Sequence, residues 1–353
     1  MHAENVTLSL NRNRTTDGMD RAAGAFGASL LVLVVALGGC AGPKKEVTYN
    51  PGEYQQVLDR QKAGLAPSNV EASSDSKDLP PKELQRLGDL YLQQGNPALA
   101  IAQYQKAVEA DPSLFRIHYK MGDMFLKKGL PQDAIQHFQE VLKHDEQDAL
   151  TFEGLGEAYF RMGNEEEAEA SFRKAIALQP DRWQTRNFLG MLLDRQKRHQ
   201  GAIAEYEQGL RLRPDEATLL NNAGLAYYLQ GRYEDAVRSF QRALRTGSGH
   251  PKIHNNLGLA LAKLNRYQDA LESFRRASNE EEAYNNLGVF YLSNNEAGHA
   301  IACFKKAIEL SPRYYDKAND NLMLATRALE KYQRTDQKTN QKTSRVNPSA
   351  CPS

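Results

Sequence analysis

The sequence predicts an all-α fold in which seven pairs of helices follow one another and a single helix closes the array. Three observations predict it: apolar residues at helical spacing, recurrence of that pattern about every 34 residues, and a chain-breaking residue between the two halves of most units. A chain of such units buries its apolar side chains between neighbouring units, not around one centre.

The unit is clearest in the stretch from Ala149 to Arg182, whose residues we number as places 1 to 34. Places 4, 7, 8 and 11 share one face of a first helix, and places 20, 24 and 27 share one face of a second. Gly163, at place 15, separates the two helices, and Pro180 ends the second because proline has no amide hydrogen to donate. The residues at the seven helical places are Phe152, Leu155, Gly156, Tyr159, Ala168, Phe172 and Ala175.

The same places are filled alike in the other units. Place 20 is alanine and place 24 is tyrosine or phenylalanine in all seven, and place 8 is glycine, as Gly88, Gly122, Gly156, Gly190, Gly224, Gly258 and Gly288. The units span residues 81–114, 115–148, 149–182, 183–216, 217–250, 251–280 and 281–314. This pattern resembles the tetratricopeptide repeat family. The resemblance implies a right-handed superhelical solenoid, but a fold by itself assigns no function.

Composition, net charge and cysteine count argue against several classes of function. The chain has 41% hydrophobic and 25% charged residues, which suits a globular protein with an ample core. A net charge of +1 gives no electrostatic case for a nucleic-acid partner. Three cysteines are too few for a disulfide scaffold. Neither a phosphate-binding loop nor metal-ligand spacing is present, so we expect no metal and no cofactor.

Residues 1–39 have the order of an export signal: arginines, an apolar run from Ala22, small residues, then Cys40. The end, from Leu37 to Cys40, resembles the lipobox of bacterial lipoproteins. That resemblance implies cleavage before Cys40, lipidation of its thiol and, with Ala41 following, the periplasmic face of the outer membrane. A transmembrane anchor is the alternative. Met19 could also be the true start, in which case residues 1–18 would not be made.

Residues 40–80 are rich in proline, glycine and serine, a composition that cannot bury enough apolar surface to order itself. We expect a lipidated Cys40 followed by a flexible tether. Within it, Glu53 to Lys62 can form a short helix.

Two repeats depart from the pattern. Repeat four has Arg186, Lys197 and Gly209 at places 4, 15 and 27, so we expect poorer packing and greater flexibility there. Repeat six is four residues short, and about one helical turn is missing near Ala277 to Glu282.

Repeats five to seven carry asparagine pairs at places 5 and 6 of their first helices: Asn221 and Asn222, Asn255 and Asn256, Asn285 and Asn286. The family resemblance puts first helices on the concave face of the solenoid. An asparagine amide both donates and accepts, so it can bind a peptide unit without reading side chains. We therefore treat the six as a candidate peptide-binding groove. The alternative is that they bond only to their neighbours.

The C-terminal end is predicted to be a capping helix at 315–332, with a polar outer face that keeps the solenoid soluble, and a disordered tail at 333–353. Cys303 is expected to be a buried apolar side chain; pairing with Cys351 is open, because nothing in the spacing favours it. His118, at core place 4, is expected to pack and not to bind a ligand.

No segment remains for a catalytic domain, so we expect a non-catalytic, membrane-anchored scaffold that binds another cell-envelope protein. Lipobox, tether and all-repeat body together resemble lipoproteins of Tad (Flp) pilus assembly and type IV pilotins. That resemblance implies a secretin or pilus-assembly partner. The alternative is a protein that binds cell-wall glycan or lipid through aromatic residues such as Tyr119, Phe160 and Tyr228.

Overall fold

The computed structural model describes residues 79–247, 249–311, 316–339 and 350–352. The signal segment, Cys40 and the tether therefore lie outside the described residues. Within them, all regular structure is helical, with fifteen α-helices and one short 3-10 helix, η2 (Pro112–Leu114). The all-α prediction is confirmed.

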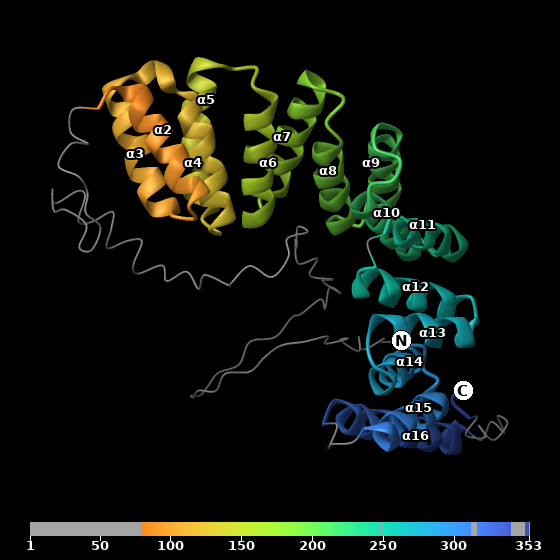
Figure 1. Ribbon diagram of the computed structural model, residues 1–353. Coiled ribbons are helices and arrows are strands. Elements are labelled where there is room, and N and C mark those ends of the chain that lie inside the picture. Colours follow the sequence, from red (N-terminus) through yellow and green to blue (C-terminus); the bar gives the residue numbers. More distant parts are fainter. Residues whose placement is uncertain (1–78, 248, 312–315, 340–349, 353) are drawn as a thin grey trace. The chain divides into compact units, whose positions relative to one another are not determined.

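The chain divides into two compact units between Gly231 and Arg232, in the turn of repeat five (Figure 1). The first unit holds α2 (Pro81–Gln93), α3 (Pro97–Ala110), α4 (Arg116–Lys127), α5 (Pro131–His144), α6 (Ala149–Met162), α7 (Glu165–Leu178), α8 (Trp183–Arg195), α9 (His199–Leu212) and α10 (Ala217–Leu229). The second holds α11 (Tyr233–Arg245), α12 (Pro251–Lys263), α13 (Tyr267–Ala277), α14 (Glu280–Ser293), α15 (Ala297–Leu310) and α16 (Asp316–Thr339).

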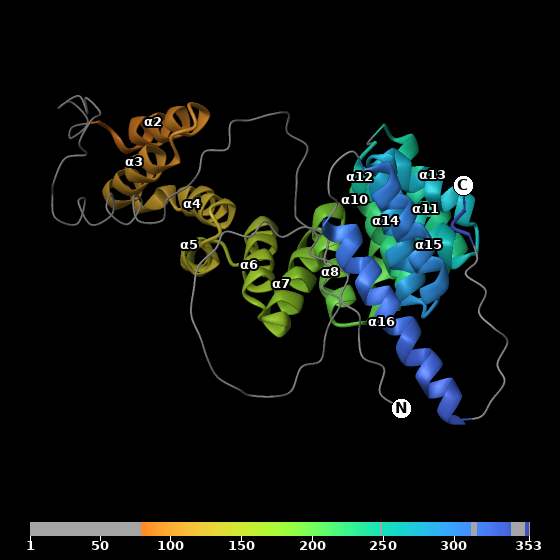
Figure 2. The ribbon, with the colours of Figure 1, turned by 90° about the horizontal axis from the view of Figure 1, so that it is seen from below.

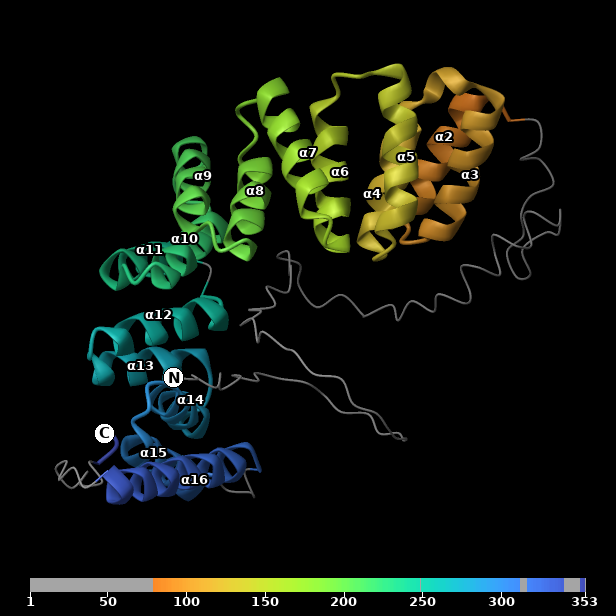
Figure 3. The same ribbon diagram turned by 180° about the vertical axis from the view of Figure 1, so that it is seen from behind.

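Within each unit, consecutive helices pack as pairs, and each pair packs on the next (Figure 3). The first unit contains the pairs α2–α3, α4–α5, α6–α7 and α8–α9. The second contains α12–α13 and α14–α15, with α16 packed on α15. This is the sequential pairing that the repeat predicts.

The glycine at place 8 lies against the aromatic ring at place 24 of the same repeat. A Cβ atom at Gly156 would be 2.5 Å from the ring of Phe172, and one at Gly122 would be 2.6 Å from the ring of Phe138. Real side chains do not approach this closely, so any larger residue would force the two helices apart. The recurrence of the glycine therefore follows from how closely each pair packs.

Places 3, 7 and 10 of the first helix face the preceding repeat. In repeat three these are Thr151, Leu155 and Ala158, with exposed fractions of 0%, 5% and 0%. From repeat two to repeat seven every residue at place 7 is at most 7% exposed, and every residue at place 10 at most 4%. These three places form the joint between repeats.

Repeat four forms helices of ordinary length despite its unusual residues. Arg186 at place 4 donates from Nη1 to Glu205 at 3.0 Å, which fills the site with an ion pair in place of an apolar contact. Gly209 leaves space that Leu219 of α10 occupies. Lys197 adopts the left-handed conformation, with φ of 61°, where most repeats use glycine or asparagine. The flexibility of this repeat stays a prediction.

Two fully buried tyrosines need a polar partner that the repeat pattern alone does not show. Tyr206, at place 24 of repeat four, donates its hydroxyl to Asp194 at 3.0 Å, and His199 Nδ1 lies 2.9 Å from the other oxygen of that carboxylate. Burial raises the pKa of both Tyr206 and Asp194. In repeat one, Tyr104 donates to Asp89 in the same way. Where place 24 is phenylalanine, no such acid is required.

The shortened sixth repeat is explained by α13, which has 11 residues where the other second helices have 13 or 14. The C-terminal end differs from expectation. The capping helix α16 continues to Thr339, seven residues beyond the expected end at Tyr332, because no proline or glycine interrupts it. Figure 2 shows α16 along its length.

α16 is aligned with the first helices of the repeats. Its Ala318, Leu322 and Ala325 occupy places 3, 7 and 10, and both alanines are fully buried. In that alignment Met323 stands at place 8, where every repeat has glycine, and its side chain is 53% exposed.

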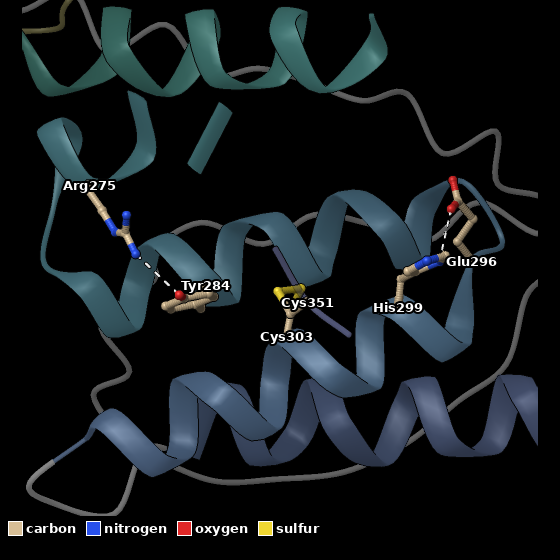
Figure 4. The surroundings of a disulfide bond; sticks show 6 residues. All are labelled: Arg275, Tyr284, Glu296, His299, Cys303 and Cys351. Atoms are coloured by element: carbon tan, nitrogen blue, oxygen red, sulfur yellow. Dashed lines mark hydrogen bonds and ion pairs between the residues drawn. A yellow bond between two sulfur atoms is a disulfide. The ribbon is translucent and has the colours of Figure 1, made fainter. Parts of the chain in front are cut away.

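Cys303 and Cys351 form a disulfide bond, with their Cα atoms 5.0 Å apart (Figure 4). Cys303 lies on α15 and is fully buried, as expected, while Cys351 is half-buried. The expectation of a wholly disordered tail is therefore wrong at residues 350–352. Nearby on α14, Tyr284 accepts a hydrogen bond from Arg275 Nη2 at 3.2 Å.

Candidate functional site

The candidate site residues lie on α10, α12 and α14, the first helices of repeats five to seven. Places 5 and 6 immediately precede place 7, which faces the preceding repeat. Their side chains therefore lie on the helix surface beside the joint between repeats. Of the six asparagines, Asn222 and Asn285 are buried, at 4% exposure each. The other four, Asn221, Asn255, Asn256 and Asn286, are half-buried.

In the first unit the asparagines connect neighbouring repeats. Asn222, at place 6, donates from Nδ2 to Oδ1 of Asn187 at 2.9 Å. Asn187 is at place 5 of repeat four. Asn221 donates in turn to Asn222 Oδ1 at 3.3 Å. The buried amides thus satisfy one another across the joint, as buried polar groups must.

The second unit repeats this arrangement. Asn286, at place 6 of α14, donates to Oδ1 of Asn255 on α12 at 3.5 Å. Asn321 of α16 donates to Oδ1 of Asn285 at 2.9 Å. The rule is common to both units: an asparagine at place 6 donates to an asparagine at place 5 of the preceding repeat. The neighbour-bonding role is therefore present in the structure.

These bonds leave hydrogen-bonding capacity on the half-buried amides. An asparagine side chain offers two N–H donors and an oxygen with two lone pairs. Asn286 gives one N–H to Asn255, and Asn255 gives only its oxygen in return. The Asn255 oxygen accepts this contact at 3.5 Å, the long limit of a hydrogen bond, and the contact does not use the NH₂ group of Asn255. An amide N–H donor of this kind suits a main-chain carbonyl oxygen of a bound segment.

Place 9 lies one turn from place 5 on the same face of the helix. The type of residue at place 9 differs between the earlier and the later repeats. Repeats four to seven have the half-buried apolar residues Met191, Leu225, Leu259 and Val289 there. Sequence reasoning missed this change, although it can be seen by comparing place 9 across the repeats.

Repeats one to three have carboxylates at place 9, and each lies beside a cation. The ion pairs are Asp89 with Lys120 at 2.6 Å, Asp123 with Lys127 at 2.5 Å, and Glu157 with Arg161 at 2.5 Å. In the later repeats, an apolar side chain at place 9 thus lies beside the asparagines. In the earlier repeats, the acid at place 9 is paired with a lysine or an arginine.

His118 packs as expected, and it has a partner that the sequence did not reveal. Its Nδ1 lies 3.0 Å from Nδ1 of His137 on α5, so one ring donates to the other. Burial lowers the pKa of His118, and it lowers the pKa of His137 to about 4. Among the described residues, no group of three or more acidic, histidine or cysteine side chains is arranged to hold a metal ion.

Cys40, the predicted lipid attachment site, lies outside the described residues. No helix in the described part of the chain is both long and apolar enough to cross a membrane.

Comparison with known proteins agrees with the repeat. The model of the family described as the C-terminal domain of cilia and flagella-associated protein 70 matches residues 46–287. The tetratricopeptide repeat model matches residues 281–314. None of the curated proteins matches the sequence.

Several solved structures are similar. The crystal structure of MamA is 30% identical over 46% of this chain and 95% of its own, with a TM-score of 0.43. A tetratricopeptide repeat protein from Parabacteroides merdae is 16% identical over 70% of this chain and 98% of its own, with a TM-score of 0.52. At that identity the likeness shows the fold alone.

Proposed function

This chain belongs to the tetratricopeptide repeat family represented by the C-terminal domain of cilia and flagella-associated protein 70, and from that premise we propose a lipid-anchored scaffold that binds an extended segment of another cell-envelope protein. Tetratricopeptide repeats are protein-binding scaffolds and are typically non-catalytic. The partner class, the anchor and the envelope location are the proposed parts.

The observation that carries the proposal is the arrangement of amides on the later first helices. Asn255 and Asn286 are half-buried, and Asn286 Nδ2 lies 3.5 Å from Asn255 Oδ1. Leu259 and Val289, one turn further along α12 and α14, supply apolar contact beside them. A bound strand would accept hydrogen bonds through its main chain and bury small apolar side chains, which is how extended peptides gain affinity and specificity.

The disulfide supports an exported location. Disulfide bonds persist in oxidising compartments and are rare in reducing ones. Of the three cysteines in the sequence, Cys303 and Cys351 are paired, and Cys40 is the one left for another modification. Its place after arginines, an apolar run and two glycines favours lipidation at the outer membrane. There the resemblance to pilus-assembly lipoproteins suggests a secretin or another pilus-assembly protein as the partner.

The matching family suggests a second candidate. Its name refers to a protein of cilia and flagella, so a scaffold in that setting is the alternative. The two candidates differ in compartment: the first requires lipidation of Cys40 and export, and the second requires neither.

The test of the anchor is metabolic labelling with a clickable palmitate analogue, followed by separation of membranes. We expect label on the wild-type chain in the outer-membrane fraction and none on Cys40→Ala. An unlabelled chain in the soluble fraction would reject the anchor and favour the second candidate.

The test of the binding site is crosslinked capture from intact membranes with Asn255→Ala/Asn286→Ala. Removing both partners of one hydrogen bond leaves no unsatisfied group, so the fold should survive. Gln241→Ala/Gln268→Ala, which removes two exposed amides from the second helices α11 and α13, is the matched control. We expect capture of the partner to fall at least tenfold in the first variant only. Equal capture by both variants would remove the asparagines from the binding site.

A further inference from the structure

The first helix of the array has an open joint. At places 7 and 10, where later repeats are buried by the repeat before them, α2 has Leu87 and Leu90. Leu87 is half-buried, and Leu90 is 46% exposed. The residues at place 10 of repeats two to seven are 0–4% exposed. An apolar surface built to be covered is therefore uncovered at this end of the described chain.

The polar residues around the two leucines do not close the joint. Glu83 and Arg86, at places 3 and 6, form an ion pair with each other at 3.8 Å, and their side chains are 52% and 81% exposed. An exposed pair of this kind contributes little to stability. The joint is thus apolar at places 7 and 10 and polar at its rim, which is the surface that one face of an amphipathic helix would cover.

We propose that Glu53 to Lys62 of this same chain forms that helix and docks on Leu87 and Leu90. The segment contains Tyr54, Val57 and Leu58 at helical spacing, and its other residues are polar or charged. These residues lie outside the described part of the chain. A second, independent observation points to them: the family model that covers the repeats begins at residue 46, so the family's pattern includes this segment.

The chain itself favours this occupant over a second copy. Residues 63–80 connect the segment to α2, and by random-coil statistics 18 residues span roughly 23 Å on average. Tethering of this kind gives an effective concentration of about a millimolar, which a weak apolar contact can exploit. A stable contact between two molecules needs roughly 1,000 Å² or more, well beyond what two leucines provide.

Docking would also limit the distance between the repeats and the membrane anchor. If residues 53–62 are bound to α2, the free tether is residues 41–52, not the whole of 41–80. The repeats would then be held close to the membrane anchor. This consequence depends on the proposed lipidation of Cys40, but the docking itself does not.

The experiment is hydrogen exchange with mass spectrometry on the full-length protein, followed on peptides covering residues 53–62. In the wild type we expect exchange at least tenfold slower than in an unstructured chain. Leu90→Asp and the double variant Val57→Asp/Leu58→Asp should each return exchange to the unstructured rate. Leu92→Asp is the matched control, because Leu92 is 41% exposed on the opposite side of the same helix and should leave the protection unchanged.

Two results would overturn the proposal. One is exchange of residues 53–62 at the unstructured rate in the wild type. The other is a dimer, detected by light scattering, that Leu90→Asp dissociates while Val57→Asp/Leu58→Asp does not, since a second copy would then cover α2. Because Leu90 and Leu92 are both exposed, their variants should keep the helical circular dichroism of the wild type.

Discussion

Replacing Cys351 with serine should destabilise the second unit and leave the first unit unchanged. The disulfide joins residues separated by 48 positions and so encloses α16 and the segment that follows it. Cys351 is half-buried, so serine fits there with little strain. The effect of the substitution is then loss of the crosslink.

The size of the effect follows from the loop. In the chain-entropy model, a crosslink that closes about 48 residues removes roughly 14 cal/mol/K from the unfolded state, or about 4 kcal/mol at 25 °C. With a urea dependence of about 2 kcal/mol/M, the midpoint of the affected transition should fall by roughly 2 M.

The assay is urea unfolding followed by two signals. Trp183, the chain's one tryptophan, lies on α8 in the first unit, so its fluorescence reports that unit. Circular dichroism reports all helices. In Cys351→Ser the fluorescence midpoint should stay constant, while a second, earlier transition appears in the dichroism. The wild type in excess dithiothreitol should match the variant. If the oxidised wild type and Cys351→Ser gave the same curves, the crosslink would contribute nothing.

Three further predictions concern the first unit and use the same fluorescence signal. Gly156→Ala should destabilise it by about 1–3 kcal/mol, because the new methyl group would overlap the ring of Phe172; a gain in stability, as expected from helix propensity alone, would contradict the close packing. Tyr206→Phe should cost about 1.5–3 kcal/mol, since Asp194 loses a hydrogen-bond donor, and an unchanged midpoint would mean that the bond is negligible. The folded pKa of His137 is about 4, below the ordinary 6.5, so the unfolded state binds the proton more readily. Stability should therefore be full above pH 6.5 and fall by up to about 3 kcal/mol towards pH 4; a His137→Gln variant with the same pH dependence would contradict this.

The repeat could be predicted because each of its constraints acts within one unit. Gly156 must meet Phe172 across a single turn, and Pro180 must end a single helix. Such short-range requirements leave a regular pattern in the sequence, and the structure confirms the helix pairs they imply.

The side-chain partners could not be predicted in the same way. Whether Asn286 faces a ligand or Asn255 depends on the offset between successive first helices, which no single unit encodes. The acid that accepts from a buried tyrosine is at place 9 in repeat one, as Asp89, but at place 12 in repeat four, as Asp194. Position in the repeat therefore does not identify it, although a tyrosine at place 24 does signal that an acceptor is needed.

The ends of the array were the least predictable parts. The bond between Cys303 and Cys351 depends on the path of a segment between α16 and residue 350, and spacing carries no information about that path. The end of α16 lies beyond the expected boundary at Tyr332 because no proline or glycine ends the helix there, and the apolar pattern used to set the boundary does not report that.

Met323 makes the outer face of α16 different from that of the first helices in the array. In repeats one to four, six and seven, place 8 is a glycine that lies directly against the aromatic ring of the paired second helix. At the same place α16 has a methionine that is 53% exposed, and a second helix packed in the same way would have to displace it. This face of α16 therefore disfavours the addition of another helix by the packing that the repeats use, and with it open-ended association of solenoids at this end.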